Sequence, residues 1–142
     1  MNYLILLRHG QSQWNLENKF TGQTDVPLTK QGEKEAINAG EIINKLNIKI
    51  DIIFCSVLTR AIKTAQLTIN QLNNYSHLYK DDNIIMTKDS ALNERDYGQL
   101  VGLNKSDVAK KCFTDDLTFY LSDYNVNVMN YFFNCKFFVD IS

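Results

Sequence analysis

The sequence predicts an α/β fold in which a parallel sheet carries helices on its faces. Three observations lead to it. Short apolar runs rich in strand-forming residues alternate with segments of helical periodicity, their order is strand, helix, strand, helix, strand, and no internal repeat or low-complexity linker interrupts them. A length of 142 residues suits one domain with a buried core.

The first predicted strand covers residues 3–7, an almost wholly apolar run that suits a buried, parallel strand. A helix is predicted from Thr29, whose hydroxyl can cap the first turn. Residues 51–55 form a second apolar run and the second predicted strand. The apolar residues of the first helix recur on one broad face: Ala36, Ile37, Ala39, Gly40, Ile43 and Leu46.

A second helix is predicted over residues 58–72, and a weaker third strand over residues 84–86 follows a polar loop. Asn104 can cap a short helix that runs to about Cys112. Ligand sites in open α/β sheets form beyond the carboxyl ends of the strands, so we expect the three loops that follow the strands to meet at one edge. The second helix is recognised by the helical spacing of Ala61, Ala65, Ile69 and Leu72.

The composition argues against several classes of protein. A net charge of −1 argues against a nucleic-acid binder, and no apolar stretch approaches the roughly 20 residues that span a bilayer. The amino terminus lacks the basic region of a signal peptide. The three cysteines fit neither a disulfide framework nor a zinc site, which favours reduced thiols in a cytoplasmic protein, and two histidines make a histidine-rich metal site improbable.

His9 follows the first strand directly and is the candidate nucleophile, since a neutral imidazole can attack phosphorus near neutral pH. Gly10 lets the backbone approach a ligand closely. Arg8 and Arg60 are candidates for clamping a phosphoryl group, because guanidinium forks match its oxygens. The alternatives are a structural histidine and two solvated surface charges.

Glu94 is the candidate general acid and base, since leaving oxygens need a proton and incoming hydroxyls lose one. Its alternative is a structural salt bridge with Arg95 or Arg60. Several other side chains or backbone groups could bind phosphate or carboxylate oxygens: Ser12, Asn15, Thr21, Gly22, Tyr97 and Lys105.

Five blocks of sequence carry a specific resemblance. They are RHGQSQWN from Arg8, FTG from Phe20, PLT from Pro27, SVLTRAIKTA from Ser56 and LNERDYGQLVGLNK from Leu92. In order and spacing they resemble the 2,3-bisphosphoglycerate-dependent phosphoglycerate mutases of the histidine phosphatase superfamily. The last block separates this group from other members that share only the RHG motif.

The resemblance implies a three-layer sandwich around a mostly parallel sheet. It also implies interconversion of 2-phosphoglycerate and 3-phosphoglycerate through a phosphohistidine at His9, primed by 2,3-bisphosphoglycerate. No metal ion is implied, and family members often form homo-oligomers. Glu94 would handle the proton, and Arg8 and Arg60 would clamp the phosphate. The implied substrate-binding set is Arg8, His9, Gly10, Gln11, Ser12, Asn15, Thr21, Gly22, Arg60, Glu94, Tyr97 and Lys105.

The resemblance stops near Cys112. Residues 1–112 carry 14 basic and 12 acidic side chains, whereas residues 113–142 carry one lysine, four acidic residues and nine of the 16 aromatic residues. The family's second histidine and arginine pair have no counterpart here: His77 lies in a polar loop, and Leu121 and Ser122 stand about where the arginines are expected.

We therefore expect a mutase-like part over residues 1–112, incomplete at its C-terminal end, and a divergent tail over residues 113–142 that is out-of-frame or unrelated sequence on a truncated gene. The apolar run at residues 131–139 could form a strand or promote aggregation. Three functional hypotheses stay open: a mutase, a weak phosphomonoesterase in which water intercepts the phosphohistidine, and an inactive remnant that at most binds phosphorylated metabolites.

Overall fold

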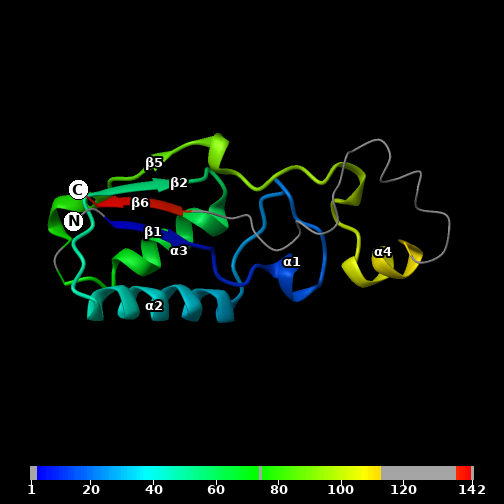
Figure 1. Ribbon diagram of the computed structural model, residues 1–142, viewed down its shortest axis with the longest axis horizontal. Coiled ribbons are helices and arrows are strands. Elements are labelled where there is room, and N and C mark those ends of the chain that lie inside the picture. Colours follow the sequence, from blue (N-terminus) through cyan, green and yellow to red (C-terminus); the bar gives the residue numbers. More distant parts are fainter. Residues whose placement is uncertain (1–2, 74, 113–136, 142) are drawn as a thin grey trace.

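A four-stranded sheet with two helices packed against one of its faces lies at one end of the molecule (Figure 1). The computed structural model describes residues 3–73, 75–112 and 137–141. Its strands are β1 (Tyr3–Leu7), β2 (Ile52–Cys55), β3 (Tyr79–Lys80), β4 (Asn83–Ile84), β5 (Thr87–Lys88) and β6 (Phe137–Ile141), and its helices are α1 (Gln13–Leu16), α2 (Lys30–Lys45), α3 (Thr59–Ile69) and α4 (Lys105–Cys112).

The strand order in the main sheet is β1-β6-β2-β5. β6 runs antiparallel to both β1 and β2, whereas β2 and β5 are parallel. β1, β2 and β5 therefore point in one direction, which confirms the predicted α/β class with parallel strands. The expectations for residues 113–136 lie outside the described residues, and the short stretch of the predicted tail that is described forms β6.

Both long helices begin where a side chain satisfies free backbone N–H groups. Thr29 caps α2 by accepting a hydrogen bond from the N–H of Gly32, as predicted. Leu58 precedes α3 and makes no side-chain cap, but Asp25 replaces it from another loop. One carboxylate oxygen of Asp25 accepts hydrogen bonds from the backbone N–H and the hydroxyl of Thr59, each at 2.8 Å. This contact ties the loop at residues 21–25 to α3.

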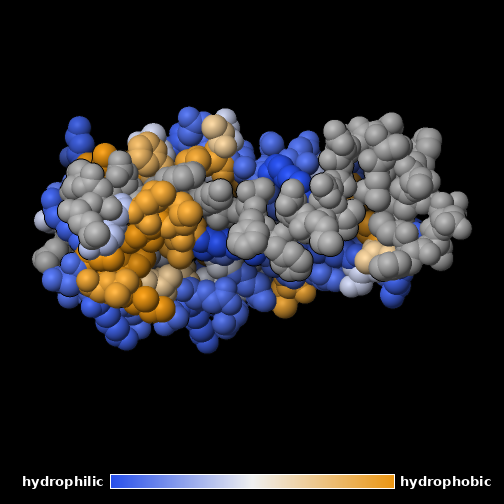
Figure 2. Space-filling view, in the orientation of Figure 1, coloured by the Kyte–Doolittle hydropathy of each residue, from blue (hydrophilic) through white to orange (hydrophobic). Residues whose placement is uncertain are grey.

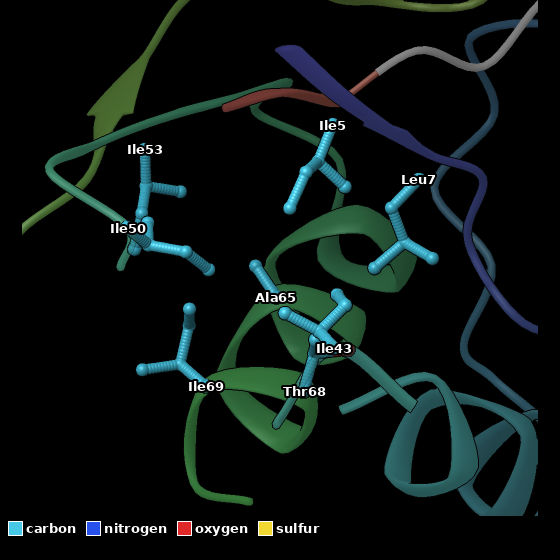
Figure 3. Close-up of a pocket in the computed structure, with 8 residues that line it drawn as sticks. All are labelled: Ile5, Leu7, Ile43, Ile50, Ile53, Ala65, Thr68 and Ile69. Carbon is cyan, nitrogen blue, oxygen red and sulfur yellow. The ribbon is translucent and has the colours of Figure 1, made fainter. Parts of the chain in front are cut away.

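The core lies between one face of the sheet and the pair α2 and α3. Figure 3 shows side chains from β1, β2 and both helices converging on a small cavity of about 20 Å³. The helices touch closely, because a Cβ at Gly40 would lie 2.3 Å from the carbonyl oxygen of Thr68. Apolar packing on this face holds the strands and helices whose ends carry the candidate site. The residues that line the cavity are Ile5, Leu7, Ile43, Ile50, Ile53, Ala65, Thr68 and Ile69.

The opposite face of the sheet is exposed, so the prediction of a buried first strand is wrong. Leu4 and Leu6 are 57% and 53% exposed, and Ile52 of β2 is 44% exposed. Side chains alternate along a strand, and among the described residues the helices packed on the sheet cover only the face that carries Ile5 and Leu7. Figure 2 shows hydrophobic surface gathered at the end of the molecule that holds the sheet.

The third predicted strand is also displaced. Ile84 belongs to a short hairpin of β3 and β4, which turns at Asp81 and Asp82, both with positive φ. Thr87 and Lys88 join the main sheet instead. The apolar run at residues 84–86 therefore begins in β4 and ends just before β5. Ile84 and Met86 pack on the core, whereas Ile85 is exposed.

The helix predictions are confirmed with adjusted ends. α2 buries Ala36, Gly40 and Ile43, but Leu46 is its C-cap and is 61% exposed, contrary to the predicted face. Asn104 caps α4 through its side-chain oxygen, which accepts hydrogen bonds from the N–H groups of Ser106 and Asp107. Within the described ranges, no helix combines the length and apolar character needed to cross a membrane.

Candidate functional site

The candidate nucleophile lies just beyond the end of β1. The Arg8 side chain is exposed, whereas His9 is buried, with 7% of its surface accessible. The Nδ1 atom of His9 lies 2.6 Å from the carbonyl oxygen of Gly10. Because a carbonyl can only accept, Nδ1 carries the proton and donates it to this hydrogen bond. The neutral ring therefore has its lone pair on Nε2.

The surroundings of His9 favour the neutral imidazole. Burial lowers its pKa from 6.5 to about 4, and the positive charges of Arg60 and Arg8 act in the same direction. The Gly10 carbonyl and the Glu35 carboxylate oppose this shift. At pH 7 the ring is neutral and can act as a nucleophile.

The loop that carries His9 is clamped between the two long helices. A Cβ at Gly10 would lie 2.1 Å from the carbonyl oxygen of Gly32, in the first turn of α2. The backbone N–H of Gly10 donates to the hydroxyl of Thr64 in α3 at 3.3 Å. The N–H of Gln11 donates to the Glu35 carboxylate at 2.8 Å, and the hydroxyl of Thr29 donates to the Gln11 side-chain oxygen at 2.8 Å.

Arg60 is almost completely buried, with 1% of its surface accessible. Its guanidinium donates to the carbonyl oxygens of Gly22 and Thr24, each at 2.8 Å, and its Nη2 lies 3.4 Å from a carboxylate oxygen of Glu94. The Nε of Arg60 has no hydrogen-bond partner among the described residues. The alternative of a solvated surface charge is therefore wrong for Arg60.

Both oxygens of the Glu94 carboxylate are in contact with the protein. Oε2 faces Arg60, and Oε1 accepts a hydrogen bond from the Tyr97 hydroxyl at 2.9 Å. Burial raises the pKa of Tyr97 to about 12, and the negative charge of Glu94 adds to the effect, so the phenol keeps its proton. The salt bridge with Arg60 that the sequence offered as an alternative is present, and it holds Glu94 beside the other candidate groups.

The neutral residues predicted to bind ligand oxygens differ in whether their side chains already form hydrogen bonds within the described part of the protein. Ser12 and Asn15 form a capping box at the start of α1, so their side chains bond each other and the local backbone. Thr21 is 4% exposed, and its hydroxyl has no partner in the described part of the chain. Gly22 adopts a φ of +55°, a conformation that favours glycine.

Lys105 lies at the start of α4. Its backbone N–H donates to the carbonyl oxygen of Asn18 at 2.7 Å, and its Nζ lies 5.7 Å from the ring centre of Phe20. The Phe20 ring in turn lies 5.4 Å from that of Tyr97. These contacts join Lys105 to the loop before Thr21 and to the aromatic side chain that bonds Glu94.

The structure thus connects residues from three loops. Interactions link Arg8, His9 and Arg60, and separately link Arg60, Glu94 and Gly22. His77 contributes to a different region, where its Nε2 lies 2.7 Å from the carbonyl oxygen of Ile50. In the described ranges, no group of three or more His, Cys, Asp or Glu side chains is placed to hold a metal ion.

Four residues with structural roles at the site were not among the predicted site residues: Gly32, Glu35, Asp25 and Thr64. Thr64 lies inside the SVLTRAIKTA block, and its place one helical turn after Arg60 was a usable signal. Asp25 and Glu35 act on backbone N–H groups distant in sequence. Nothing in local spacing indicates such contacts.

Comparison with known proteins gives concordant matches. A family model described as the histidine phosphatase superfamily (branch 1) matches residues 4–126, which extends past Cys112. The 2,3-bisphosphoglycerate-dependent phosphoglycerate mutase of Caulobacter vibrioides is 47% identical over 126 residues, covering 89% of this chain and 50% of the relative. The enzyme of the same name from Staphylococcus saprophyticus is 48% identical, covering 89% and 52%. The chain spans about half the length of these relatives.

Solved structures with a similar fold include phosphatases. A mycobacterial glucosyl-3-phosphoglycerate phosphatase in complex with VO3 has a TM-score of 0.62 and 25% identity, covering 82% of this chain and 52% of that protein. A putative alpha-ribazole-5'-P phosphatase from Escherichia coli has a TM-score of 0.63 and 25% identity, covering 88% and 55%.

Proposed function

The chain belongs to the histidine phosphatase superfamily, and we propose that it interconverts 2-phosphoglycerate and 3-phosphoglycerate through a phosphohistidine at His9, primed by 2,3-bisphosphoglycerate. The observation that carries the proposal is the state of His9. Its ring is buried, neutral at pH 7, and bonded through Nδ1 to the Gly10 carbonyl, which leaves Nε2 as the nucleophile. Similarity to mutases at 47–48% identity supplies the substrate class.

In the first step, Nε2 of His9 attacks the phosphorus of the donor, so that a P–N bond forms and the P–O bond to the glycerate oxygen breaks. Glu94 in its protonated form gives a proton to the leaving oxygen. In the second step, the Glu94 carboxylate takes a proton from the hydroxyl of the bound monophosphate as that oxygen attacks the phosphohistidine. The contacts to Arg60 and Tyr97 hold both carboxylate oxygens for this exchange.

Positive charge stabilises the phosphoryl group during transfer. Arg8 and Arg60 are the cations whose fields reach His9. Two buried polar groups, the Nε of Arg60 and the hydroxyl of Thr21, have no partner among the described residues, and we propose that anionic oxygens of the substrate bond them. Gly10, Gln11, Ser12, Asn15, Gly22, Tyr97 and Lys105 are proposed to complete the substrate site. The chemistry needs no metal ion.

A specific observation favours a second candidate function. The similar solved structures include phosphatases, and water in place of a hydroxyl acceptor would release inorganic phosphate from the same phosphohistidine. The two functions share the first step and differ in the second.

One assay separates these functions. The full chain is incubated with 3-phosphoglycerate and catalytic 2,3-bisphosphoglycerate, and both 2-phosphoglycerate and inorganic phosphate are measured, with His9→Gln as the matched control. Formation of 2-phosphoglycerate without equivalent phosphate release supports the mutase. Phosphate release alone supports the phosphomonoesterase, and neither product in the wild type contradicts both.

A further inference from the structure

The hydroxyl of Thr64 joins the nucleophile loop to the helix that carries Arg60. Thr64 lies in α3, one turn after Arg60, and is fully buried. We propose that Thr64 is a positioning residue, which holds the peptide between His9 and Gly10 and thereby keeps the His9 ring in the tautomer with its proton on Nδ1. The inference rests on the proposed function of His9 as nucleophile.

Three hydrogen bonds connect Arg60, Thr64, Gly10 and His9 in turn. The Thr64 hydroxyl donates to the carbonyl oxygen of Arg60 at 2.8 Å and accepts from the N–H of Gly10 at 3.3 Å. The carbonyl of Gly10 then accepts from Nδ1 of His9 at 2.6 Å. A hydroxyl has one proton, and Thr64 donates it to the carbonyl oxygen of Arg60, so the Thr64 oxygen faces Gly10 as an acceptor.

Gly10 is the hinge between two peptides that are held separately. Thr64 holds the His9–Gly10 peptide, and Glu35 holds the Gly10–Gln11 peptide by accepting the Gln11 N–H at 2.8 Å. Glycine permits wide rotation about its Cα, so neither bond fixes the other peptide. Gly32 packs against the same loop from α2 and prevents it from moving in that direction. Loss of the Thr64 hydroxyl therefore releases the His9–Gly10 peptide, which carries the His9 side chain. Glu35 still holds the Gly10–Gln11 peptide with the Gly10 carbonyl, so the alignment of Nδ1 with this carbonyl weakens from the His9 side.

Thr68 provides a matched control. It lies one turn further along α3, is 3% exposed, and donates from its hydroxyl to the carbonyl oxygen of Ala36 in α2 at 3.0 Å. Thr64→Val and Thr68→Val remove the same atom from the same helix. The first change breaks the contact with the His9 loop, and the second breaks only a contact between helices.

The test reads the tautomer directly. The chain has two histidines, so ¹⁵N-histidine labelling of the full chain gives separate ring signals for His9 and His77. The His77 signal serves as the control for folding. Spectra at pH 7 are compared for the wild type, Thr64→Val, Thr64→Ser and Thr68→Val. We expect the ratio of the Nδ1–H to the Nε2–H tautomer of His9 to fall about threefold or more in Thr64→Val, in line with a weakened hydrogen bond. It should stay at the wild-type value in Thr64→Ser and Thr68→Val.

An unchanged tautomer ratio in folded Thr64→Val overturns the inference, and so does an equal change in Thr68→Val. If Thr64→Val does not fold, hydrogen exchange at the Gly10 amide of the wild type decides. Exchange at least about a hundredfold slower than in an unstructured peptide is expected, and exchange at the unstructured rate overturns the inference. No phosphoryl donor is used, so failure here is distinct from failure of phosphorylation at His9.

Discussion

The buried guanidinium of Arg60 lies 3.4 Å from the Glu94 carboxylate and also bonds two carbonyl oxygens of the loop at residues 22–24. One side chain thus joins the first turn of α3, the loop that follows α1 and the loop that follows β5. Its position fixes the distance between the cation and the candidate acid before any ligand binds. This arrangement makes Arg60 important for stability as well as for chemistry.

Replacement of Arg60 by leucine is expected to lower the free energy of unfolding by about 3–5 kcal/mol. The change removes the cation beside a largely buried carboxylate and the Arg60 donors of two loop carbonyls. Urea denaturation measures the loss. Arg8→Leu is the control, because Arg8 is exposed and its removal should change stability by less than about 0.5 kcal/mol. Equal losses in the two variants would contradict the structural role of Arg60.

Replacement of Glu94 by glutamine is expected to slow phosphoryl transfer by about 10²–10⁴-fold while leaving substrate binding mostly intact. Glutamine keeps the shape of the side chain and a hydrogen bond with Tyr97, but it cannot exchange a proton. Single-turnover transfer to 3-phosphoglycerate gives the rate, and calorimetry gives the binding constant. A wild-type rate in this variant would remove Glu94 from the proposed mechanism.

His9 makes stability depend on pH. Its pKa is about 4 in the folded chain and 6.5 in the unfolded chain, so the unfolded state binds more protons between these values. Stability therefore rises with pH in this window, and the contribution of His9 that is lost on acidification from pH 7 to below pH 4 is about 3 kcal/mol.

Urea denaturation between pH 4 and pH 7 tests this dependence. The His9→Gln variant should lack the His9 component of the slope, whereas His77→Gln should retain it because His9 is still present. A slope that persists undiminished in His9→Gln would show that other groups cause it.

The exposed face of β1 should affect association more than folding. Leu4 and Leu6 are more than half exposed, whereas Ile5 between them lines the core cavity. Leu4→Gln and Leu6→Gln together should reduce aggregation, measured by light scattering, with little change in stability. Ile5→Gln should destabilise the chain by about 2–5 kcal/mol. Increased scattering in the double variant would contradict this assignment of the two faces.

The fold was predictable where the signal lies in local periodicity. The caps of α2 and α4 and the buried face of α3 follow from Thr29, Asn104 and the spacing of Ala61 and Ala65. The exposure of Leu4 was not predictable, since it depends on which elements cover each face of the sheet rather than on the strand itself. The short β5 was misplaced because it consists of two polar residues, Thr87 and Lys88, whereas the apolar run that predicted the strand ends at Met86.

The candidate site shows a similar division. The order of the sequence motifs indicated His9, Arg60 and Glu94. In the structure, the positive charge of Arg60 acts on His9, and its guanidinium forms an ion pair with Glu94. The contribution of Asp25, Glu35 and Thr64 arises from side chains that bond backbone N–H groups 24 to 54 residues away. Such contacts depend on the tertiary fold, so residue spacing alone does not reveal them.

Phosphorylation of His9 tests the central claim most directly. The full chain is incubated with 2,3-bisphosphoglycerate labelled with ³²P, and the labelled residue is located by peptide mapping under alkaline conditions that preserve phosphohistidine. The proposed mechanism predicts one labelled site at His9, discharge of the label on addition of 3-phosphoglycerate, and no label in His9→Gln. Label that persists in His9→Gln, or none in the folded wild-type chain, would contradict it.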